Sequence, residues 1–375
     1  MNIGTISFNI NTPDFNYGAM LHSWAFQQYL LKQEFVDSAE VIDYTMPILE
    51  GRHRNMPFID SLLHFRVRTA CKQILTCRLY QERLRKFNDF VSSQLIVSKE
   101  KYTQQSLNDS KLSYDTIICE SDVIWSPTFS GGHFDKSFFF FFFCMKNMTR
   151  IAYSPSMGNG DLNAEQEIEL KDLLNYVDYI SCRESYEKSI LERYTEKDVT
   201  HVLDPVLLLT EDEYVKIIAS RIIQGKYILL YLPVNDNLQL RKSAEKYAQD
   251  NNMSILEIST KLRKENRNNY VCMPTAGIEE FLSGIKYAEC VFTNSVHAIC
   301  FSVIFHTNFY AFSRAYAGKV KDICDVLGLS QYYFPDDKFV ERKPINYEKV
   351  DERLEQLKKT SVEWLEQALF RSNDK

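Results

Sequence analysis

The feature that most constrains the fold is an alternation of short apolar segments with longer helical patterns, which runs along the chain twice. Ile3 to Phe8 and Tyr114 to Cys119 have the pattern of buried strands in the first half, and Tyr227 to Leu232 restarts the series in the second. Helical patterns follow such strands, as from Gly18 to Gln33. Because parallel strands need long crossover connections, which are usually helices, this order predicts α/β structure with parallel sheets covered by helices.

Two series of this kind predict two Rossmann-like lobes that face a cleft. We expect an N-terminal lobe over 1–210, with a basic helical insertion at about 52–90, and a C-terminal lobe over 211–345. Residues 346–375 are expected to form a C-terminal helix. The length of 375 residues agrees with this division, because single domains usually span about 100–200 residues.

Composition and charge argue against several classes of protein. Acidic residues outnumber Lys and Arg by 50 to 44, and the net charge of −6 argues against a nucleic-acid-binding protein. The nine cysteines are scattered without a C-x-x-C pair, and no signal-peptide pattern is visible, so we expect a reducing, cytoplasmic location. The run Phe138 to Phe143 is too short to span a bilayer and is expected to form a buried strand or the edge of a core.

The segment from Arg52 to Lys86 differs from the rest of the chain in charge. It carries nine Lys and Arg residues against Asp60 and Glu82, with apolar residues between the bases. A basic amphipathic stretch of this kind suits an anionic membrane surface or a phosphorylated lipid. The alternative is an inserted pair of helices that packs on the first lobe and leaves its bases in solvent.

Candidate ligand-binding residues lie where the expected strands end, because ligands of doubly wound sheets bind beyond the carboxyl ends of the strands. The segment 293–297 joins a strand to a helix, whose free N–H groups and positive dipole end suit a phosphate or a carboxylate. His297 in the first turn is either a proton donor or a structural residue. Arg183 is either an anion ligand or the partner of Glu184, and Arg314 lies in the loop after another strand.

Several common enzyme classes have no motif in this chain. The sequence lacks G-x-G-x-x-G, the phosphate-loop lysine signature, H-E-x-x-H and G-x-S-x-G. Nicotinamide-dependent, nucleoside-triphosphate-dependent, zinc-protease and serine-hydrolase functions are therefore without motif support.

Six short segments, in order along the chain, are similar to motifs of the polysaccharide pyruvyl transferase family. They resemble the patterns NYGxxLQ, GSDxxW, YAxSxG, SxRE, DPxLLL and TDSFHG. In this sequence the corresponding segments are Asn16–Leu21, Glu120–Trp125, Ile151–Gly158, Ser181–Glu184, Asp204–Leu208 and Thr293–Ala298. The order and spacing agree from about Asn2 to Leu329, which is nearly the whole chain.

The resemblance implies a fold like that of the two-lobed (GT-B type) glycosyltransferases and a reaction with phosphoenolpyruvate. Pyruvate would become a cyclic ketal across two hydroxyls of a sugar, with release of phosphate, in the synthesis of capsular polysaccharide, exopolysaccharide or another cell-surface glycan. The reaction requires no metal or redox cofactor. One form that the acceptor could take is a lipid-pyrophosphate-linked saccharide, held by the basic segment at the inner face of the membrane.

The same resemblance assigns donor and acceptor sites to different motifs. His297 is expected to act as the general acid, and Asp122 to take up a hydroxyl proton. The residues expected to bind phosphoenolpyruvate are Arg183, Asn294, Ser295, Val296, His297 and Arg314. Those expected to bind the acceptor are Asn16, Tyr17, Gly18, Ser121, Asp122 and Trp125.

Three residues depart from the family pattern. Asn294 stands where Asp is common, which removes a carboxylate base, while Glu120 replaces Gly and His22 replaces Gln. Two other functions stay open on the sequence alone. One is a nucleotide-sugar glycosyltransferase of the same fold, and the other is a non-catalytic glycan-binding or assembly protein.

Overall fold

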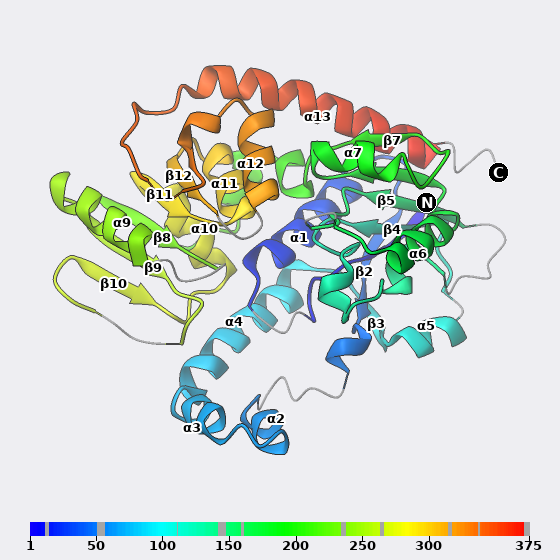
Figure 1. Cartoon of the computed structure of the whole chain (residues 1–375), viewed down its shortest axis with the longest axis horizontal. Coiled ribbons are helices and arrows are strands. Elements are labelled where there is room, and N and C mark those ends of the chain that lie inside the picture. The colour runs from blue at the N-terminus through cyan, green and yellow to red at the C-terminus, as the bar shows by residue number, and fades with distance from the viewer. Residues whose placement is uncertain are drawn as a thin grey trace.

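The structure, a computed structural model, contains two parallel sheets with helices between and around them. It describes residues 1–11, 15–50, 57–110, 112–141, 148–158, 161–233, 238–262, 266–313, 317–336 and 338–370. Neighbouring strands in both sheets pair in parallel, which confirms the prediction of an α/β fold. Figure 1 shows the two sheets side by side with helix α1 (Tyr17–Leu31) between them.

The first sheet lies in the N-terminal part and has the strand order β3-β2-β1-β4-β5-β6-β7. Its strands are β1 (Asn2–Ile6), β2 (Ser38–Tyr44), β3 (Val97–Tyr102), β4 (Thr116–Glu120), β5 (Thr149–Tyr153), β6 (Tyr179–Cys182) and β7 (Val199–His201). The helices around it include α5 (Gln104–Asp109), α6 (Ala164–Leu174) and α7 (Ser185–Leu191). The order of strands reverses between β1 and β4, so the carboxyl ends of these two strands form a topological switch point.

The second sheet repeats this design with the order β10-β9-β8-β11-β12-β13. Its strands are β8 (Tyr227–Tyr231), β9 (Ser254–Ile258), β10 (Tyr270–Met273), β11 (Cys290–Thr293), β12 (Asn308–Phe312) and β13 (Tyr333–Phe334). The helices of this part are α8 (Glu211–Val215), α9 (Leu238–Asp250), α10 (Ile278–Lys286), α11 (Val296–Ile304) and α12 (Ala317–Val326). The order again reverses between β8 and β11, and α11 begins directly after that switch point.

Helix α13 (Tyr347–Phe370) contacts both lobes. At its start, the Tyr347 hydroxyl donates to the Thr307 carbonyl at 2.5 Å, in the second lobe. Further along, the Ser361 hydroxyl accepts a hydrogen bond of 2.9 Å from the backbone N–H of Leu203 in the first lobe. One cluster of buried apolar side chains also runs from α1 into the second sheet. The two lobes therefore share a core, and the boundary at residue 210 stays a prediction.

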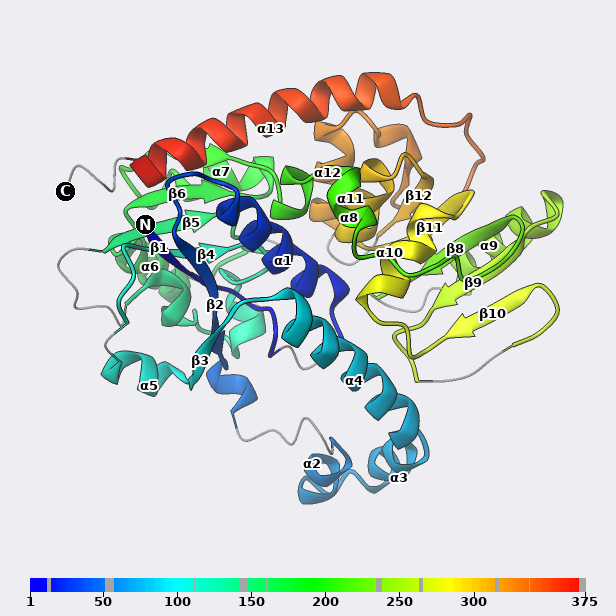
Figure 2. The same cartoon turned by 180° about the vertical axis from the view of Figure 1, so that it is seen from behind.

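The basic segment forms three helices, α2 (Pro57–Leu63), α3 (Val67–Leu75) and α4 (Cys77–Gln94), while Arg52 and Arg54 lie outside the described residues. Helix α4 runs between the lobes, whereas α2 and α3 project away from both sheets (Figures 1 and 2). Arg83 of α4 is buried and Lys86 is paired with Glu280 of α10, so these two bases are not left in solvent.

The described part of the phenylalanine run, Phe138 to Phe141, does not form a strand. Phe138 and Phe139 end the 3-10 helix Lys136–Phe139, and Phe140 turns the chain with a φ of +60°. The three rings are buried, with Phe139 stacked on Trp125, whereas Phe142 and Phe143 lie outside the described residues. The Asp135 side chain favours the turn, because it accepts the N–H of Ser137. In the part of the chain that the structure describes, no helix has the length and apolar content needed to cross a membrane.

Candidate functional site

Charged side chains from both lobes meet at the carboxyl edge of the first sheet. Glu120 ends β4, Arg183 follows β6, and Asp204 lies beyond β7. His297 reaches them from the first turn of α11 in the second lobe. All four side chains are buried, which removes most of the water that would screen their charges. This edge contains the switch point between β1 and β4, where a ligand site is expected in such a fold.

Asp204 is the centre of this cluster. Its Oδ2 atom accepts a hydrogen bond of 2.8 Å from the Ser121 hydroxyl, and lies 3.4 Å from Nη1 of Arg183 and 3.3 Å from Nε2 of His297. Its Oδ1 atom accepts the N–H of Val206. Burial alone would raise the pKa of Asp204, but the neighbouring His297 and Arg183 outweigh burial and hold it well below its usual range. Asp204 is therefore a fixed negative charge that joins the two lobes.

Arg183 lies between two carboxylates. Its Nε atom donates to Glu184 Oε1 at 2.9 Å, and Nη1 faces Asp204. The ion pair with Glu184 that the sequence allowed as an alternative is therefore present. Burial opposes the charge on Arg183, but Glu184 and Asp204 outweigh it and raise the pKa of the guanidinium. Two carboxylates, those of Glu184 and Asp204, thus hold the Arg183 guanidinium in a fixed position at the site.

Lys319 of α12 is a second cation, and its pKa depends on the charges of this cluster. It is half-buried, and burial followed by the charge of Arg183 lowers its pKa, while Glu184, Asp122 and Glu187 act in the opposite direction. Helix α12 packs against α7, which begins at Ser185, two residues after Arg183. Helix α12 contacts the first lobe directly as well, because Asp322 accepts the N–H of Ser185 at the start of α7 (Figure 1).

The imidazole ring of His297 packs against the backbone of α1 at Gly18. Ser295 caps α11 by accepting the N–H of Ala298, and this fixes the first turn, in which His297 lies. A Cβ atom added at Gly18 would lie 2.0 Å from Nδ1 of the imidazole, which is far closer than atoms can approach. Only glycine at position 18 therefore leaves room for this ring. This contact gives a physical reason for the glycine of the Asn16-Tyr17-Gly18 motif.

The strand ends beside Asp204 adopt a backbone conformation that is rare for residues other than glycine. Ser121 and Asp122 after β4 have φ values of 48° and 53°, and Ser154 after β5 has 50°. Left-handed conformations of this kind cost about 1–2 kcal/mol per residue and cluster at functional sites. They turn Asp122 so that its Oδ2 atom lies 3.4 Å from the Asn16 side-chain nitrogen. Two of the predicted acceptor residues, Asn16 and Asp122, are therefore in contact.

Other predicted site residues have different positions. Trp125 is fully buried in the first lobe, where its ring stacks on Phe139 and its N–H donates to the Phe138 carbonyl, so it has no surface for an acceptor. Tyr17 is also a packing residue, because it stacks on Phe281 of the second lobe with ring centroids 4.5 Å apart. Both assignments are corrected by this burial. Arg314 lies outside the described residues.

The remaining donor residues lie at the start of α11. Asn294 is buried at the end of β11, whereas Ser295 and Val296 are half-buried. Asp204 and Lys319 were not predicted as site residues from the sequence. Asp204 is the first residue of the DPxLLL segment, so that motif could have identified it. Lys319 belongs to no motif, because only the packing of α12 brings it to the first lobe.

Comparison with known proteins decides the family. The model of the polysaccharide pyruvyl transferase family matches residues 16–316, which is most of the chain. The chain belongs to this family. Membership supports a transferase that acts in glycan biosynthesis by pyruvyl transfer. A comparison with curated proteins gives no match.

A solved structure of a sugar-processing protein shares the two-lobed fold. UDP-GlcNAc 2-epimerase from Methanocaldococcus jannaschii aligns with a TM-score of 0.51 at 12% identity, over 95% of this chain and 92% of the epimerase. UDP-GlcNAc 2-epimerase from Neisseria meningitidis aligns with a TM-score of 0.47 at 12% identity, over 98% and 94% of the two chains. The first of these and the two sheets described above confirm the two-lobed (GT-B type) fold of this pyruvyl transferase family member.

Two of the three departures from the family pattern form a single contact. His22 Nδ1 lies 2.6 Å from Glu120 Oε2, and the Ser23 hydroxyl donates to Glu120 Oε1 at 2.5 Å. Both residues of the pair are fully buried. Burial would lower the pKa of His22, but Glu120 outweighs it and the pKa is raised. The histidine at position 22 thus offsets the buried charge of the glutamate at position 120. Because 98 positions separate the two residues, the sequence does not show that these two replacements are linked.

Proposed function

We propose that this protein transfers pyruvate from phosphoenolpyruvate to two hydroxyls of one sugar, and so forms a cyclic ketal and releases phosphate. The observation that carries the proposal is the meeting of Arg183, Asp204 and His297 at one sheet edge, in a chain of the polysaccharide pyruvyl transferase family. Asp122 follows β4 at the same edge, and Lys319 lies on α12, which packs against α7. The product would belong to a capsular polysaccharide, an exopolysaccharide or another cell-surface glycan.

The donor carries a phosphate and a carboxylate, and both need positive partners. We assign Arg183 and Lys319 to these groups, together with the N-terminus of α11 at Asn294 and Ser295, where free N–H groups and the helix dipole favour an anion. Glu184 and Asp204 already fix the position of Arg183. A guanidinium held in this way loses little conformational freedom when the donor binds.

His297 is the proposed general acid. It protonates the methylene carbon of phosphoenolpyruvate, which becomes the methyl group, while the adjacent carbon gains oxocarbenium character. Because Nδ1 packs against Gly18, we assign the transferred proton to Nε2, the nitrogen that faces Asp204 at 3.3 Å. This nitrogen makes no hydrogen bond in the described part of the chain, and the Asp204 carboxylate beside it is held by Ser121.

Asp122 is the proposed base on the acceptor side. It takes the proton of the sugar hydroxyl that attacks the cationic carbon, and Asn16 holds the carboxylate in place. Phosphate then leaves, and the second hydroxyl closes the ketal ring as its proton passes to the released phosphate. The scheme requires no metal or redox cofactor. The acceptor we favour is a lipid-pyrophosphate-linked saccharide at the inner face of the membrane, because the basic segment offers cations to such a carrier.

The deciding experiment incubates the full chain with phosphoenolpyruvate and a panel of free and lipid-linked saccharides. We expect phosphate release together with an acceptor mass gain of one pyruvate less one water. His297→Ala should lower the rate about 100-fold or more while the fold is retained, with Ile168→Ala on the exposed face of α6 as the matched control. Consumption of a nucleotide sugar without use of phosphoenolpyruvate would instead identify a glycosyltransferase. Binding of glycan without turnover would identify an assembly protein.

A further inference from the structure

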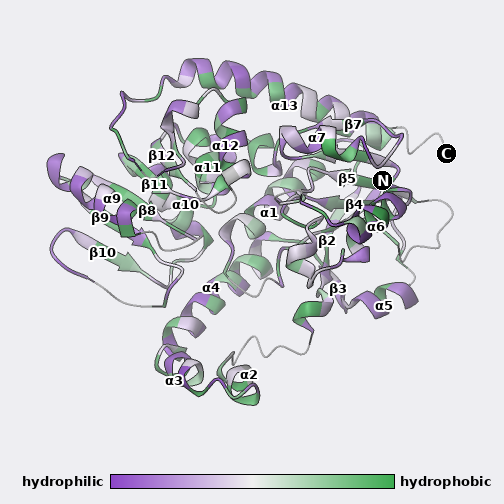
Figure 3. Ribbon diagram, in the orientation of Figure 1, coloured by the Kyte–Doolittle hydropathy of each residue, from purple (hydrophilic) through white to green (hydrophobic). Residues whose placement is uncertain are grey.

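The α2–α3 hairpin, residues 57–75, exposes apolar side chains that a folded protein ordinarily buries. Six of the fifteen exposed large apolar side chains in the described part of the chain lie on it. They are Leu62, Leu63, Phe65, Val67, Ile74 and Leu75. Phe65 is 90% exposed and Leu75 is 86% exposed. Figure 3 shows this hairpin at the periphery of the molecule, with hydrophobic residues on α2 and both hydrophobic and hydrophilic residues on α3, so packing within this chain does not explain its exposed apolar side chains.

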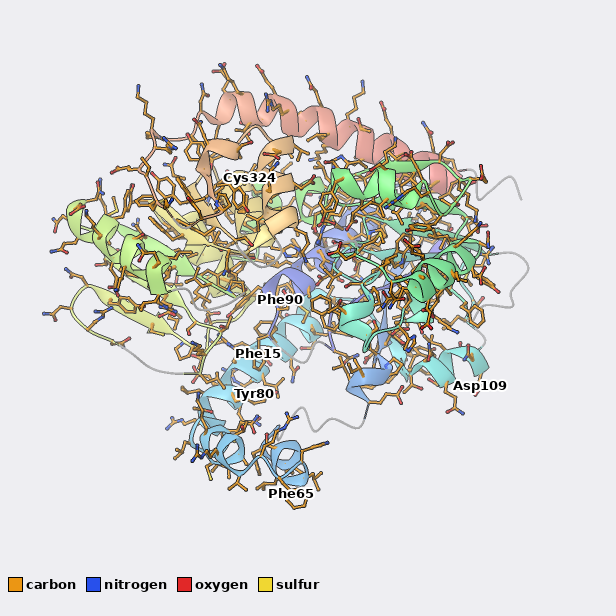
Figure 4. The ribbon with its side chains drawn as sticks, in the orientation of Figure 1. Phe15, Phe65, Tyr80, Phe90, Asp109 and Cys324 are labelled. Carbon is orange, nitrogen blue, oxygen red and sulfur yellow. The ribbon has the colours of Figure 1, made fainter. Side chains whose placement is uncertain are left out.

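Phe65 is held in solvent by a strained turn. The N–H of Phe65 bonds to the Leu62 carbonyl at 3.0 Å, and the N–H of Arg66 bonds to the Ser61 carbonyl at 2.7 Å. These two bonds form a Schellman motif, in which the residue at the position of Phe65 is left-handed and usually glycine. Phe65 has a φ of +54°. The chain thus keeps an unfavourable aromatic residue where folding favours glycine, and Figure 4 shows its side chain at the tip of the hairpin, pointing away from the protein.

The charge of the hairpin is predominantly positive. Asp60 is the one acidic residue in the sequence from 57 to 75, and from position 61 to position 81 the sequence contains no Asp or Glu, although the chain as a whole has a net charge of −6. Arg66, Arg68 and Lys72 lie among the exposed apolar side chains and are themselves exposed. A protein partner would be expected to require a complementary acidic groove, whereas an anionic lipid surface satisfies both the cations and the apolar side chains at once.

We propose that the α2–α3 hairpin docks the protein on an anionic membrane surface. Phe65 enters the boundary between headgroups and acyl chains together with the exposed Leu63 and Leu75 of the same hairpin, and the three cations bind the headgroups. The hairpin is joined to the lobes by α4, whose Arg83 donates to the Ser259 carbonyl of the second lobe. Docking would therefore place the junction of the lobes near the lipid surface, where a lipid-linked acceptor is found if the proposed function holds.

The test measures vesicle binding of the full chain and needs no enzymatic turnover, so it stands even if the proposed function fails. Phosphatidylcholine vesicles with and without phosphatidylglycerol are floated with wild type and variants at low and high salt. Wild type is expected to float with the anionic vesicles at low salt. Replacing Arg66, Arg68 and Lys72 with Gln together lowers this binding about 100-fold.

Phe65→Gly is the sharpest variant, because it separates binding from folding. Glycine removes the strain of the left-handed turn, so the melting temperature stays equal or rises, while vesicle binding falls about 10-fold or more through loss of the aromatic side chain. Ile168→Ala removes another exposed apolar group, from α6, and leaves binding unchanged. Equal flotation of wild type and Phe65→Gly overturns the proposal. So does a wild-type dimer that Phe65→Gly converts to monomer without any binding to vesicles, since the hairpin is then an interface between two copies.

Discussion

Replacing His22 and Glu120 singly and together tests whether they form one energetic unit. Both side chains are fully buried and 2.6 Å apart, so removing either charge leaves the other without its partner in a low-dielectric site. Breaking a buried pair in this way costs about 3–5 kcal/mol. His22→Gln and Glu120→Gln keep much of the side-chain size, so we expect the lower end, about 3 kcal/mol for each.

The double variant is expected to lose about 3 kcal/mol rather than about 6, because two amides can bond to each other without a buried charge. The coupling is then about 3 kcal/mol, which is the upper end of the range for residues in contact. Urea unfolding followed by tryptophan fluorescence measures it, since a loss of 3 kcal/mol shifts the midpoint by about 1 M when m is near 3 kcal/mol/M.

The exposed pair of Arg85 and Asp89, four residues apart on α4, provides the matched control. Asp89→Asn is expected to change the free energy of unfolding by less than about 0.5 kcal/mol, because exposed ion pairs contribute little. If the losses of His22→Gln and Glu120→Gln simply add in the double variant, the two residues are independent. The two departures from the family pattern would then be unrelated.

Three further outcomes follow from the site. Gly18→Ala should lower turnover about 100-fold or more with unchanged circular dichroism, because the new Cβ displaces His297 from Asp204; full activity in this variant would mean that the ring is placed elsewhere. Lys319→Met should raise the KM for phosphoenolpyruvate about 10-fold or more with kcat within about twofold, and an unchanged KM would remove Lys319 from the donor site. The pKa of His22 is raised in the folded protein. The pair of His22 with Glu120 therefore contributes its full stabilisation of the folded state below the ordinary histidine pKa of about 6.5, and this stabilisation is lost as the pH rises through the raised pKa. Wild type should therefore lose stability relative to His22→Gln as pH rises in urea titrations, and parallel pH profiles would contradict the shift.

Local pattern predicted the elements of the sheets well, because buried parallel strands and their helices have distinct lengths and periodicities. The expected strand Tyr227 to Leu232 is one residue longer than β8, and the helical pattern from Gly18 to Gln33 covers most of α1. The Phe138 to Phe143 run was expected to form a buried strand or the edge of a core, and the second alternative holds for Phe138 to Phe140, which are buried in a 3-10 helix and turn capped by the Asp135 carboxylate. Trp125 was placed in the acceptor site because its motif ends at the strand edge, whereas packing turns its side chain into the core.

Contacts between distant elements explain most of what the sequence did not reveal. The 98 positions between His22 and Glu120 carry no periodicity that could link them, and Lys319 reaches Arg183 only because α12 packs against α7. The basic segment is the intermediate case. The sequence predicted its charge and its helices. It could not show that α4 packs between the lobes while α2 and α3 project from them, because this difference depends on tertiary packing.

The packing of His297 against Gly18 has a consequence for when proton transfer can occur. The proposed acid belongs to the second lobe, but its supports, Gly18 and Asp204, belong to the first. Any separation of the lobes therefore takes the proton donor away from the residues that orient it. Under the proposed function, the donor can be protonated only while the two lobes are in contact, so proton transfer depends on the junction between them.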